Sequence, residues 1–358
     1  MRVSENASLR SSTTFRLGGA AKRLVEVERE SEVLEIVADV DGRGEPLLVL
    51  GGGSNLVVAD EGFPGTVLRM ATRGIDTASG SSRSGSGSGE ERVLVTACAG
   101  EPWDDFVTRM VSEGLAGVEC LAGIPGLVGA VPMQNVGAYG QDVSETIVRV
   151  RTWDRSARRL VDFDRAACRF SYRSSVFRGR EDHVILAVTF ELTRSRESAP
   201  IRYAELARAL GVAEGARAPA SLVRETIVRL RRGKGMVLDE SDHDTWSAGS
   251  FFTNPILDAS SLAALRERVG AGVSMPEFAE PDGRTKVSAA WLIERAGFAK
   301  GHRAGNVSIS TKHALALTNR GGATTSELLS LARSIRDGVR LRFGVTLENE
   351  PILVGTTL

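Results

Sequence analysis

The segment AGSFFTNP, residues 248–255, places one hydroxyl group among apolar side chains. Ser250 lies between Gly249 and two phenylalanines, and Asn254-Pro255 ends the segment. Phenylalanines are uncommon in surface loops, and a buried hydroxyl needs a hydrogen-bond partner. Ser250 is therefore either a core serine that is satisfied by its neighbours or a hydroxyl that the chain holds in an apolar, turn-bounded pocket for a purpose that these residues alone do not show.

The densest glycine segment is LAGIPGLVGAVPMQNVGAYG, residues 121–140. Its glycines let a backbone approach a ligand closely, and successive N–H groups can bind an anion such as a pyrophosphate. The alternative is a tight connection that only packs. A second glycine turn, LGGGSNLVV, has neither the G-x-G-x-x-G pattern nor a P-loop lysine. Two such segments favour a large nucleotide cofactor that is not held in the Rossmann manner.

Three further motifs contain charged groups, each with two possible roles. Arg173 in RFSYRSSVF is either a solvated cation or a fixed cation that binds an anionic substrate. Lys234 in RLRRGKG either stabilises a helix C-terminus or binds a diphosphate. Glu348 and Glu350 in LENEP are predicted to share one strand face, either at a solvated edge or close to a catalytic hydroxyl.

The composition predicts a soluble globular chain of two or three domains. The 358 residues are 42% hydrophobic, and 45 basic residues balance 45 acidic ones, which argues against a nucleic-acid partner. Three cysteines outside CxxC spacing and four scattered histidines predict neither disulfides nor a metal site. The first residues lack an apolar leader, and no apolar run approaches the roughly 20 residues of a membrane span. We therefore expect a cytoplasmic protein without membrane insertion.

The elements that must position these motifs alternate at first between strand and helix patterns. Strands are predicted at RLVEVE, PLLVL, LVVAD and RVLVTACAG, with a helix capped by Ser31 after the first. The first three strands and this helix suggest a small α/β unit. The Gly/Ser tract at residues 79–89 predicts an inserted surface loop.

Longer elements follow in the rest of the chain. A helix with Pro102 in its first turn is predicted at EPWDDFVTRMVSEGLAG, and strands at TIVRVRTW and HVILAVTFEL. Helices are predicted at SLVRETIVRLRRG and VSAAWLIERAG. The last long helix starts with the capping box Thr324-x-x-Glu327, and PILVG is a strand. This mixture indicates an α+β fold rather than a doubly wound parallel sheet.

In their order along the chain, these motifs resemble those of the bacterial UDP-N-acetylenolpyruvoylglucosamine reductases. Besides the segments quoted above, TTFRLGG, AAWLIERAG and STKHALALTN extend the resemblance over nearly the whole chain. The resemblance implies an FAD-binding fold of the vanillyl-alcohol-oxidase type with two α/β subdomains, plus a smaller α+β substrate-binding domain. The implied parts are residues 1–70 completed by 344–358, residues 71–232, and residues 233–343.

The activity that the resemblance implies is reduction of UDP-N-acetylglucosamine enolpyruvate to UDP-N-acetylmuramate, in peptidoglycan precursor synthesis. NADPH would reduce the FAD, and the enolpyruvyl methylene carbon would take a hydride from flavin N5 before the adjacent carbon is protonated. The alternatives are another FAD-dependent oxidase or dehydrogenase of the same fold, and a non-catalytic nucleotide-binding module. The presence of Ser250, Arg173 and Glu350 counts against the module.

The resemblance also implies a role for each motif residue. Ser250 would donate the proton, while Arg173 and Glu350 would flank the reacting enol ether, with the guanidinium pairing to the substrate carboxylate. The residues implied for FAD are Gly51, Gly52, Gly53, Ser54, Asn55, Ile124, Pro125, Gly126, Gly129, Gln134, Asn135 and Gly137. Those implied for the UDP-sugar diphosphate and its surroundings are Tyr203, Lys234, Asn254 and His313. Tyr203 lies in IRYAEL, typical of the class that closes a tyrosine over the substrate, and some relatives have glutamine at the position of His313.

Overall fold

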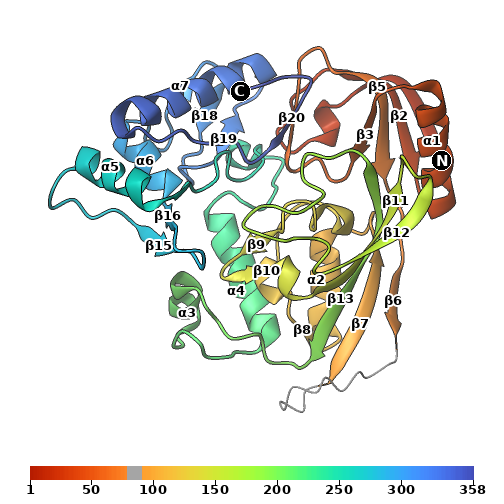
Figure 1. Cartoon of the computed structure of the whole chain (residues 1–358), viewed down its shortest axis with the longest axis horizontal. Coiled ribbons are helices and arrows are strands. Elements are labelled where there is room, and N and C mark those ends of the chain that lie inside the picture. Colours follow the sequence, from red (N-terminus) through yellow and green to blue (C-terminus); the bar gives the residue numbers. More distant parts are fainter. Residues whose placement is uncertain (79–90) are drawn as a thin grey trace. The chain divides into compact units, whose positions relative to one another are not determined.

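The structure, a computed structural model, describes residues 1–78 and 91–358 (Figure 1). The tract predicted as a loop at residues 79–89 lies outside this described part. The chain folds into two compact units, each assembled from several segments. The first unit comprises Met1–Ala7, Ala21–Gly52 and the described part of Pro64–Val237, and the second comprises Ser8–Ala20, Gly53–Phe63 and Leu238–Leu358.

Each unit encloses an apolar core of its own. The core of the first unit is built from residues between Val25 and Ile227, and that of the second unit runs from Phe15 to Leu347. Among the described residues, no buried side chain is shared between the two cores, so the division follows the packing of side chains as well as the backbone. The three-part division implied by the resemblance stays a prediction.

In the described part of the first unit there are two larger sheets and one two-stranded ribbon. One has the strand order β1-β2-β5-β3, in which β3 and β5 are parallel, and the other follows the order β12-β11-β13-β7-β6, with β8 paired to β13. The strands are β1 (Arg2–Ser8), β2 (Ala20–Val27), β3 (Leu47–Leu50), β5 (Phe63–Met70), β6 (Ile75–Ala78), β7 (Arg92–Cys98), β8 (Leu115–Ala116), β11 (Ile147–Asp154), β12 (Arg159–Asp164) and β13 (His183–Arg194). The helices are α1 (Glu30–Arg43), α2 (Trp103–Ser112), α3 (Ala204–Leu210) and α4 (Ala220–Gly233), and a small ribbon is formed by β9 (Gly137–Ala138) and β10 (Gln141–Asp142).

Helix α2 shows how the predicted apolar pattern becomes packing. Trp103, Phe106, Val107 and Met110 are all fully buried, because the spacing i, i+3, i+4, i+7 places them on one helix face. Pro102 is the N-cap residue and lies just before the first turn, not within it as predicted. Its fixed φ and missing N–H suit this position, where an N–H would have no partner in the helix.

Helix α1 begins before the predicted N-cap, Ser31. Its N-cap is Arg29, and the Glu32 carboxylate accepts the backbone N–H groups of Glu28 at 2.9 Å and Arg29 at 3.2 Å. The carboxylate in the first turn thus accepts the N–H groups of the N-cap residue and of the residue before it, as the glutamate of a capping box does. Ser31 therefore lies inside the helix.

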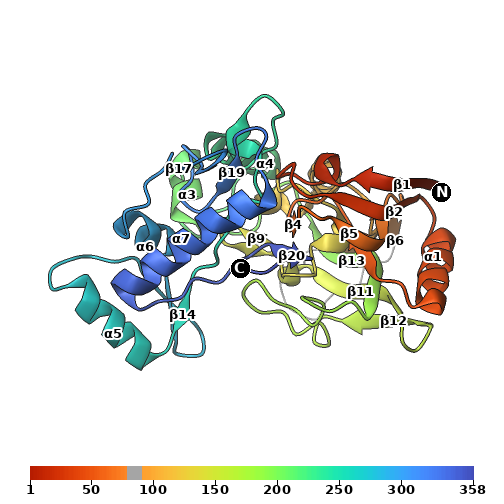
Figure 2. The same cartoon turned by 90° about the horizontal axis from the view of Figure 1, so that it is seen from above.

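The second unit contains three small sheets and three helices (Figure 2). The strands are β4 (Leu56–Val58) paired with β20 (Ile352–Val354), β14 (Ile256–Leu257), β16 (Thr285–Val287) and β15 (Glu277–Ala279) in one sheet, and β17 (Arg303–Ala304), β18 (Val307–Ile309) and β19 (Leu317–Asn319) in another. The helices are α5 (Ala259–Val269), α6 (Ala289–Arg295) and α7 (Thr325–Phe343). The sequence predicts β4 together with β2 and β3 in one α/β unit. This is wrong, because β4 pairs in parallel with β20.

The predicted capping box begins helix α7. The Thr324 side chain accepts the Glu327 N–H at 3.1 Å, and the Glu327 carboxylate accepts the Thr324 N–H at 2.8 Å. Asp60 accepts the next two N–H groups, from Thr325 at 2.8 Å and Ser326 at 2.9 Å, and so attaches the β4 segment to the helix. Among the described residues, neither α7 nor any shorter helix combines the length and apolarity needed to cross a bilayer.

Candidate functional site

The two glycine segments meet in the first unit. A Cβ atom on Gly52 would lie 2.8 Å from the backbone α-carbon of Gly126, a distance that real Cβ atoms do not reach. One on Gly51 would be in ordinary contact with the Leu127 side chain, at 3.8 Å. Only glycine at position 52 allows these two backbones to approach, so the structure joins two motifs that the sequence predicts separately.

A pocket of about 600 Å³ lies beside Gly51 and Gly52. Its lining combines the glycine backbone, three apolar side chains, three arginines and two glutamates, and Arg69 pairs with Glu26 at 3.4 Å. The lining residues are Glu26, Glu28, Arg29, Gly51, Gly52, Arg69, Met70, Ala71, Arg73 and Leu127. A glycine edge with nearby guanidinium groups suits an anionic pyrophosphate, and the apolar side chains suit the rest of a dinucleotide. The residues present therefore fit a cofactor such as FAD.

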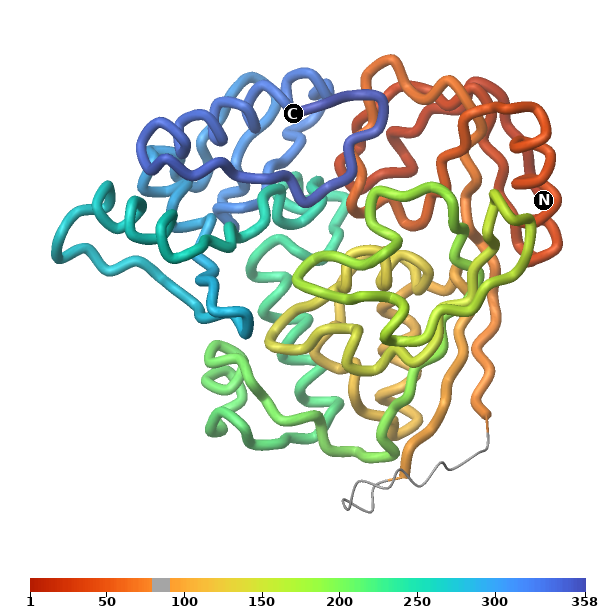
Figure 3. Tube along the Cα trace, in the orientation of Figure 1, coloured from red at the N-terminus to blue at the C-terminus, as the bar shows by residue number. Residues whose placement is uncertain are grey.

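The longer glycine segment packs against the Arg173 motif in the same unit (Figure 3). The Asn135 amide donates to the Ser171 carbonyl at 3.1 Å, and the Ser175 hydroxyl donates to the Met133 carbonyl at 2.7 Å. Arg173 Nη2 donates to the carbonyl of Gly137 at 2.7 Å. The guanidinium is thus attached to the segment that is implied for FAD.

Arg173 is held in an uncommon backbone conformation. Its φ is +51°, in the left-handed region that non-glycine residues adopt rarely. Its side chain is 21% exposed, and Nη1 lies 3.9 Å from a carboxylate oxygen of Asp142. A strained, mostly buried guanidinium is more consistent with a fixed cation than with a solvated surface group.

Other residues implied for FAD have packing roles in the structure. Gly129 donates its N–H to the Ala99 carbonyl at 2.8 Å, and a Cβ there would lie 2.6 Å from that of Ala99. Gly53 belongs to the second unit and has a φ of +61°, and its Cβ would lie 1.9 Å from the Ser12 carbonyl oxygen. The Asn55 carbonyl accepts an N–H from β20 at 2.9 Å. These contacts explain the residue types and leave the cofactor roles as proposals.

Ser250 lies in the second unit, where its neighbours fix the backbone. Gly249 has a φ of +73°, and the Phe251 N–H donates to the Leu315 carbonyl at 2.7 Å. The rings of Phe251 and Phe252 are fully buried in the core of the unit, while Ser250 is half-buried. The two phenylalanines therefore anchor the serine beside a fixed turn.

Glu350 is hydrogen-bonded to this segment through its backbone. Its N–H donates to the Phe251 carbonyl at 2.8 Å, one residue from Ser250. The prediction that Glu348 and Glu350 share a strand face is wrong. Among the described residues, their segment forms one isolated bridge, between Phe252 and Asn349, and is not part of a strand. Glu348 is exposed and Glu350 is half-buried, which distinguishes the two carboxylates.

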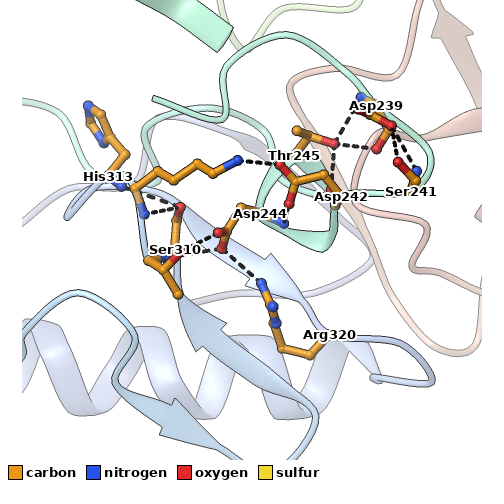
Figure 4. Close-up of polar contacts among 10 residues, drawn as sticks. Asp239, Ser241, Asp242, Asp244, Thr245, Ser310, His313 and Arg320 are labelled. Carbon is orange, nitrogen blue, oxygen red and sulfur yellow. Dashed lines mark hydrogen bonds and ion pairs between the residues drawn. The ribbon is translucent and has the colours of Figure 1, made fainter. Parts of the chain in front are cut away.

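A buried carboxylate, Asp244, organises the turn that precedes His313 (Figure 4). It is 4% exposed and accepts the N–H of Thr311 at 3.0 Å, its hydroxyl, and Nη1 of Arg320 at 2.8 Å. Burial alone would raise the pKa of Asp244, but the hydrogen bonds from Thr311 and the charges of Arg320 and Lys312 lower it overall. The carboxylate is therefore ionised and holds residues 310–313 in place.

His313 points away from Asp244, and one ring nitrogen is already used (Figure 4). The Leu315 N–H donates to Nδ1 of His313 at 3.1 Å. A nitrogen that accepts has no proton, so in the neutral tautomer that fits this bond the hydrogen lies on Nε2. Because the Leu315 carbonyl accepts from Phe251, this ring is linked through one residue to the Ser250 segment.

Asn254, also implied for substrate, has a structural contact at the start of helix α6. Its Oδ1 atom accepts the N–H of Ala289 at 2.9 Å, next to the N-cap Ser288. This bond satisfies a donor that has no partner within the helix. It also fixes the end of the segment that begins at Ala248.

Tyr203 and Lys234 lie in the first unit, where the start of α3 is near the end of α4. Tyr203 is the N-cap residue of α3, and Lys234 is the C-cap residue of α4. Lys234 Nζ lies 2.5 Å from a carboxylate oxygen of Glu205 and 5.4 Å from the ring centre of Tyr139. The rings of Tyr139 and Tyr203 meet edge to face at 5.3 Å. Burial lowers the pKa of Lys234, but the Glu205 hydrogen bond and the nearby tyrosines raise it overall, so the amine is charged.

The residues that sequence reasoning missed are Asp244, Glu205 and Tyr139. The sequence could have indicated two of them as site residues. Glu205 follows Tyr203 by two positions, and Tyr139 lies at the end of the glycine segment. Asp244 lies in the acidic run DESDHD, which resembles a solvated surface until its partners are known.

Comparison with known proteins agrees with this organisation. A model of the FAD binding domain matches residues 21–161, and one of the UDP-N-acetylenolpyruvoylglucosamine reductase C-terminal domain matches residues 240–354. The reductase of Thermobifida fusca is 56% identical over 99% of this chain and 98% of its own, and that of Cutibacterium acnes is 50% identical over 99% and 91%. The crystal structure of the Thermus caldophilus reductase has a TM-score of 0.64 at 24% identity and covers 99% of both chains, which supports the fold.

The matched FAD binding domain and the glycine-lined pocket define an FAD-dependent oxidoreductase with an α+β fold, as predicted. The full-length relatives then identify the group within this class. The chain belongs to the UDP-N-acetylenolpyruvoylglucosamine reductase family.

Proposed function

We propose that Ser250, Arg173 and Glu350 are the catalytic residues of an NADPH-dependent, FAD-containing reductase. The enzyme reduces UDP-N-acetylglucosamine enolpyruvate in peptidoglycan precursor synthesis, and the product is UDP-N-acetylmuramate. Since NADPH and nucleotide sugars are cytoplasmic compounds, we place the enzyme in the cytoplasm.

When bound, FAD accepts a hydride from NADPH and supplies one to the enolpyruvyl methylene carbon. The residues proposed to hold it are those at the junction of the two glycine segments, chiefly Gly51, Gly52 and Gly126, with the rest of the implied set. Their contribution is a backbone that comes close to the pyrophosphate without side chains in the way. Arg69 and Arg73, which line the adjoining pocket, supply positive charge.

Arg173 binds the carboxylate of the enolpyruvyl group in this proposal. Hydride addition at the methylene carbon leaves negative charge on the adjacent carbon, and this charge spreads into the carboxylate. A guanidinium that is fixed before the reaction stabilises the charge as it forms. The contacts of Arg173 with the Gly137 carbonyl and Asp142 fix it in this way.

Ser250 donates the proton that completes the reduction. A serine hydroxyl is a weak acid, but the carbanion or enol that forms is a strong enough base to take its proton. Its backbone is held by the buried Phe251, and Glu350 is attached to the same segment. Glu350 can therefore orient the hydroxyl or polarise the intermediate.

Lys234, Tyr203, Asn254 and His313 bind the UDP-sugar diphosphate and its surroundings. His313 offers a neutral N–H donor at Nε2, which is also what a glutamine amide offers. This chemical likeness supports a shared role for the two residue types that occur at this position.

The observation that carries the assignment is the backbone attachment of Glu350 and Leu315 to Phe251, beside Ser250. The test is an anaerobic flavin spectrum of the purified holoenzyme. We expect NADPH to bleach the flavin and UDP-N-acetylglucosamine enolpyruvate to restore its colour without oxygen. A flavin that bleaches and stays reduced would contradict this substrate and favour another dehydrogenase of the same fold.

A further inference from the structure

Glu205 lies where an anionic ligand of Lys234 would lie. Its carboxylate oxygen is 2.5 Å from Nζ of Lys234, and the two side chains are 38% and 31% exposed. The amine also lies over the Tyr139 ring, so its surroundings in the first unit combine one carboxylate and one aromatic face. Both residues are partly accessible, so a dissolved anion can reach the amine.

We propose that Glu205 is a resident counter-ion of Lys234, which the diphosphate of the substrate must displace. This inference rests on the proposed function, in which Lys234 binds that diphosphate. A carboxylate and a diphosphate repel each other when they share one cation, so binding of the second favours departure of the first. Glu205 thereby lowers the affinity for the substrate and keeps the amine charged and positioned before the substrate arrives.

The strength of the pair suits displacement. The pair is half-buried, so water still reaches and screens the charges, and two long side chains must be ordered to form it. Removing such a competitor is expected to tighten ligand binding by roughly two- to fivefold. A deeply buried pair would instead hold the amine too firmly for a ligand to take it.

Displacement of the carboxylate would also affect the segment that carries Tyr203. Glu205 lies in the first turn of α3. Tyr203 is the N-cap residue of the same helix and has no side-chain capping bond. The pair between Glu205 and Lys234 therefore attaches this turn to the end of α4, and its release frees the turn on which Tyr203 lies.

The test measures the dissociation constants of UDP and of UDP-N-acetylglucosamine enolpyruvate with the oxidised holoenzyme, by calorimetry at low salt. We expect Glu205→Gln to bind both about two- to fivefold more tightly, and to lower KM with little change in kcat. Glu225→Gln is the matched control, since this glutamate lies on α4 roughly two and a half turns before Lys234 and its loss changes the net charge equally. Glu205→Ala repeats the charge removal without the amide.

Two further variants separate the inference from the function on which it rests. Lys234→Ala is expected to weaken binding of both ligands, and Glu205→Gln is expected to have no effect in that background. If Lys234→Ala leaves binding unchanged, the diphosphate role of Lys234 is wrong. If Lys234→Ala weakens binding while Glu205→Gln alone leaves it unchanged or weakens it, the counter-ion role is wrong and the role of Lys234 stands.

Discussion

Ser250 and Lys234 are held by contacts of opposite character. The Ser250 segment is fixed by backbone hydrogen bonds and two fully buried phenylalanines, and the neighbouring turn is fixed by the buried carboxylate of Asp244. Lys234 is held by one half-buried ion pair and an aromatic face. A proton donor needs a fixed position, whereas a residue that binds a mobile ligand needs a contact that can be exchanged.

The largest effect is expected from removing the hydroxyl group of Ser250, which lies in the fixed region. Ser250→Ala is expected to slow reoxidation of the reduced flavin by the enolpyruvyl substrate by roughly 10²- to 10⁴-fold, because the general acid is lost. Reduction by NADPH should be unchanged. Anaerobic stopped-flow absorbance separates these two half-reactions, with Thr253→Val as the control for a nearby hydroxyl. Equal losses in both half-reactions would contradict a proton-donor role.

The next effect tests the buried carboxylate that supports this region. Asp244→Asn is expected to lower the free energy of unfolding by about 2 kcal/mol, because the buried position loses the charge that accepts from Thr311 and pairs with the half-buried Arg320. Denaturation followed by tryptophan fluorescence measures this loss. A change below about 1 kcal/mol would show that the network contributes little.

The pH dependence follows from the lowered pKa of Asp244. Its contribution to stability is complete above the ordinary carboxyl pKa of 3.8 and is lost as the pH falls through its lower folded value. Wild-type stability should therefore decline below about pH 4, and Asp244→Asn should decline less steeply. Parallel slopes for the two proteins would contradict this assignment.

A smaller effect tests whether the N–H group at Nε2 of His313 donates to the substrate. His313→Gln is expected to keep KM for the enolpyruvyl substrate within about threefold, whereas His313→Leu raises it about tenfold. Steady-state kinetics with each variant measures the difference. Equal KM values for the glutamine and leucine variants would mean that Nε2 does not contact the substrate.

The smallest effect is expected at Glu205, and it compares the stability contribution of this ion pair with that of Asp244. Glu205→Gln makes the same carboxylate-to-amide change as Asp244→Asn, but at a pair that is only half-buried. We expect it to change the free energy of unfolding by less than about 1 kcal/mol. The same denaturation measurement applies, and a loss equal to that of Asp244→Asn would remove the distinction.

The local parts of this structure could be predicted from the sequence. The apolar face of α2, the Thr324 capping box and most strands depend on neighbouring residues, which spacing describes. The motifs AGSFFTNP and YRSSVF also indicated the candidate residues. Ser31 is not the cap because the helix already begins at Glu30. There the Glu32 carboxylate accepts the N–H groups of Glu28 and Arg29, and local reasoning could have weighed Glu32.

The long-range contacts could not be predicted in the same way. Asp244 and Thr311 are 67 positions apart, and Glu205 and Lys234 are 29 apart, so no periodic pattern relates them. The LENEP segment has the alternating pattern of a strand. In the part of the chain that the structure describes, it forms one isolated β-bridge, between Asn349 and Phe252. Pairing of this kind depends on what the rest of the chain brings alongside, which local propensity does not encode.

The parallel pairing of β4 with β20 has a consequence for synthesis on the ribosome. β4 ends at Val58, while β20 begins at Ile352, so the earlier strand emerges long before its partner. At bacterial translation rates of about 5–20 residues per second, the wait is roughly fifteen seconds to a minute. The second unit therefore matures after the first during translation, and its early segments are exposed to chaperones and proteases throughout that interval.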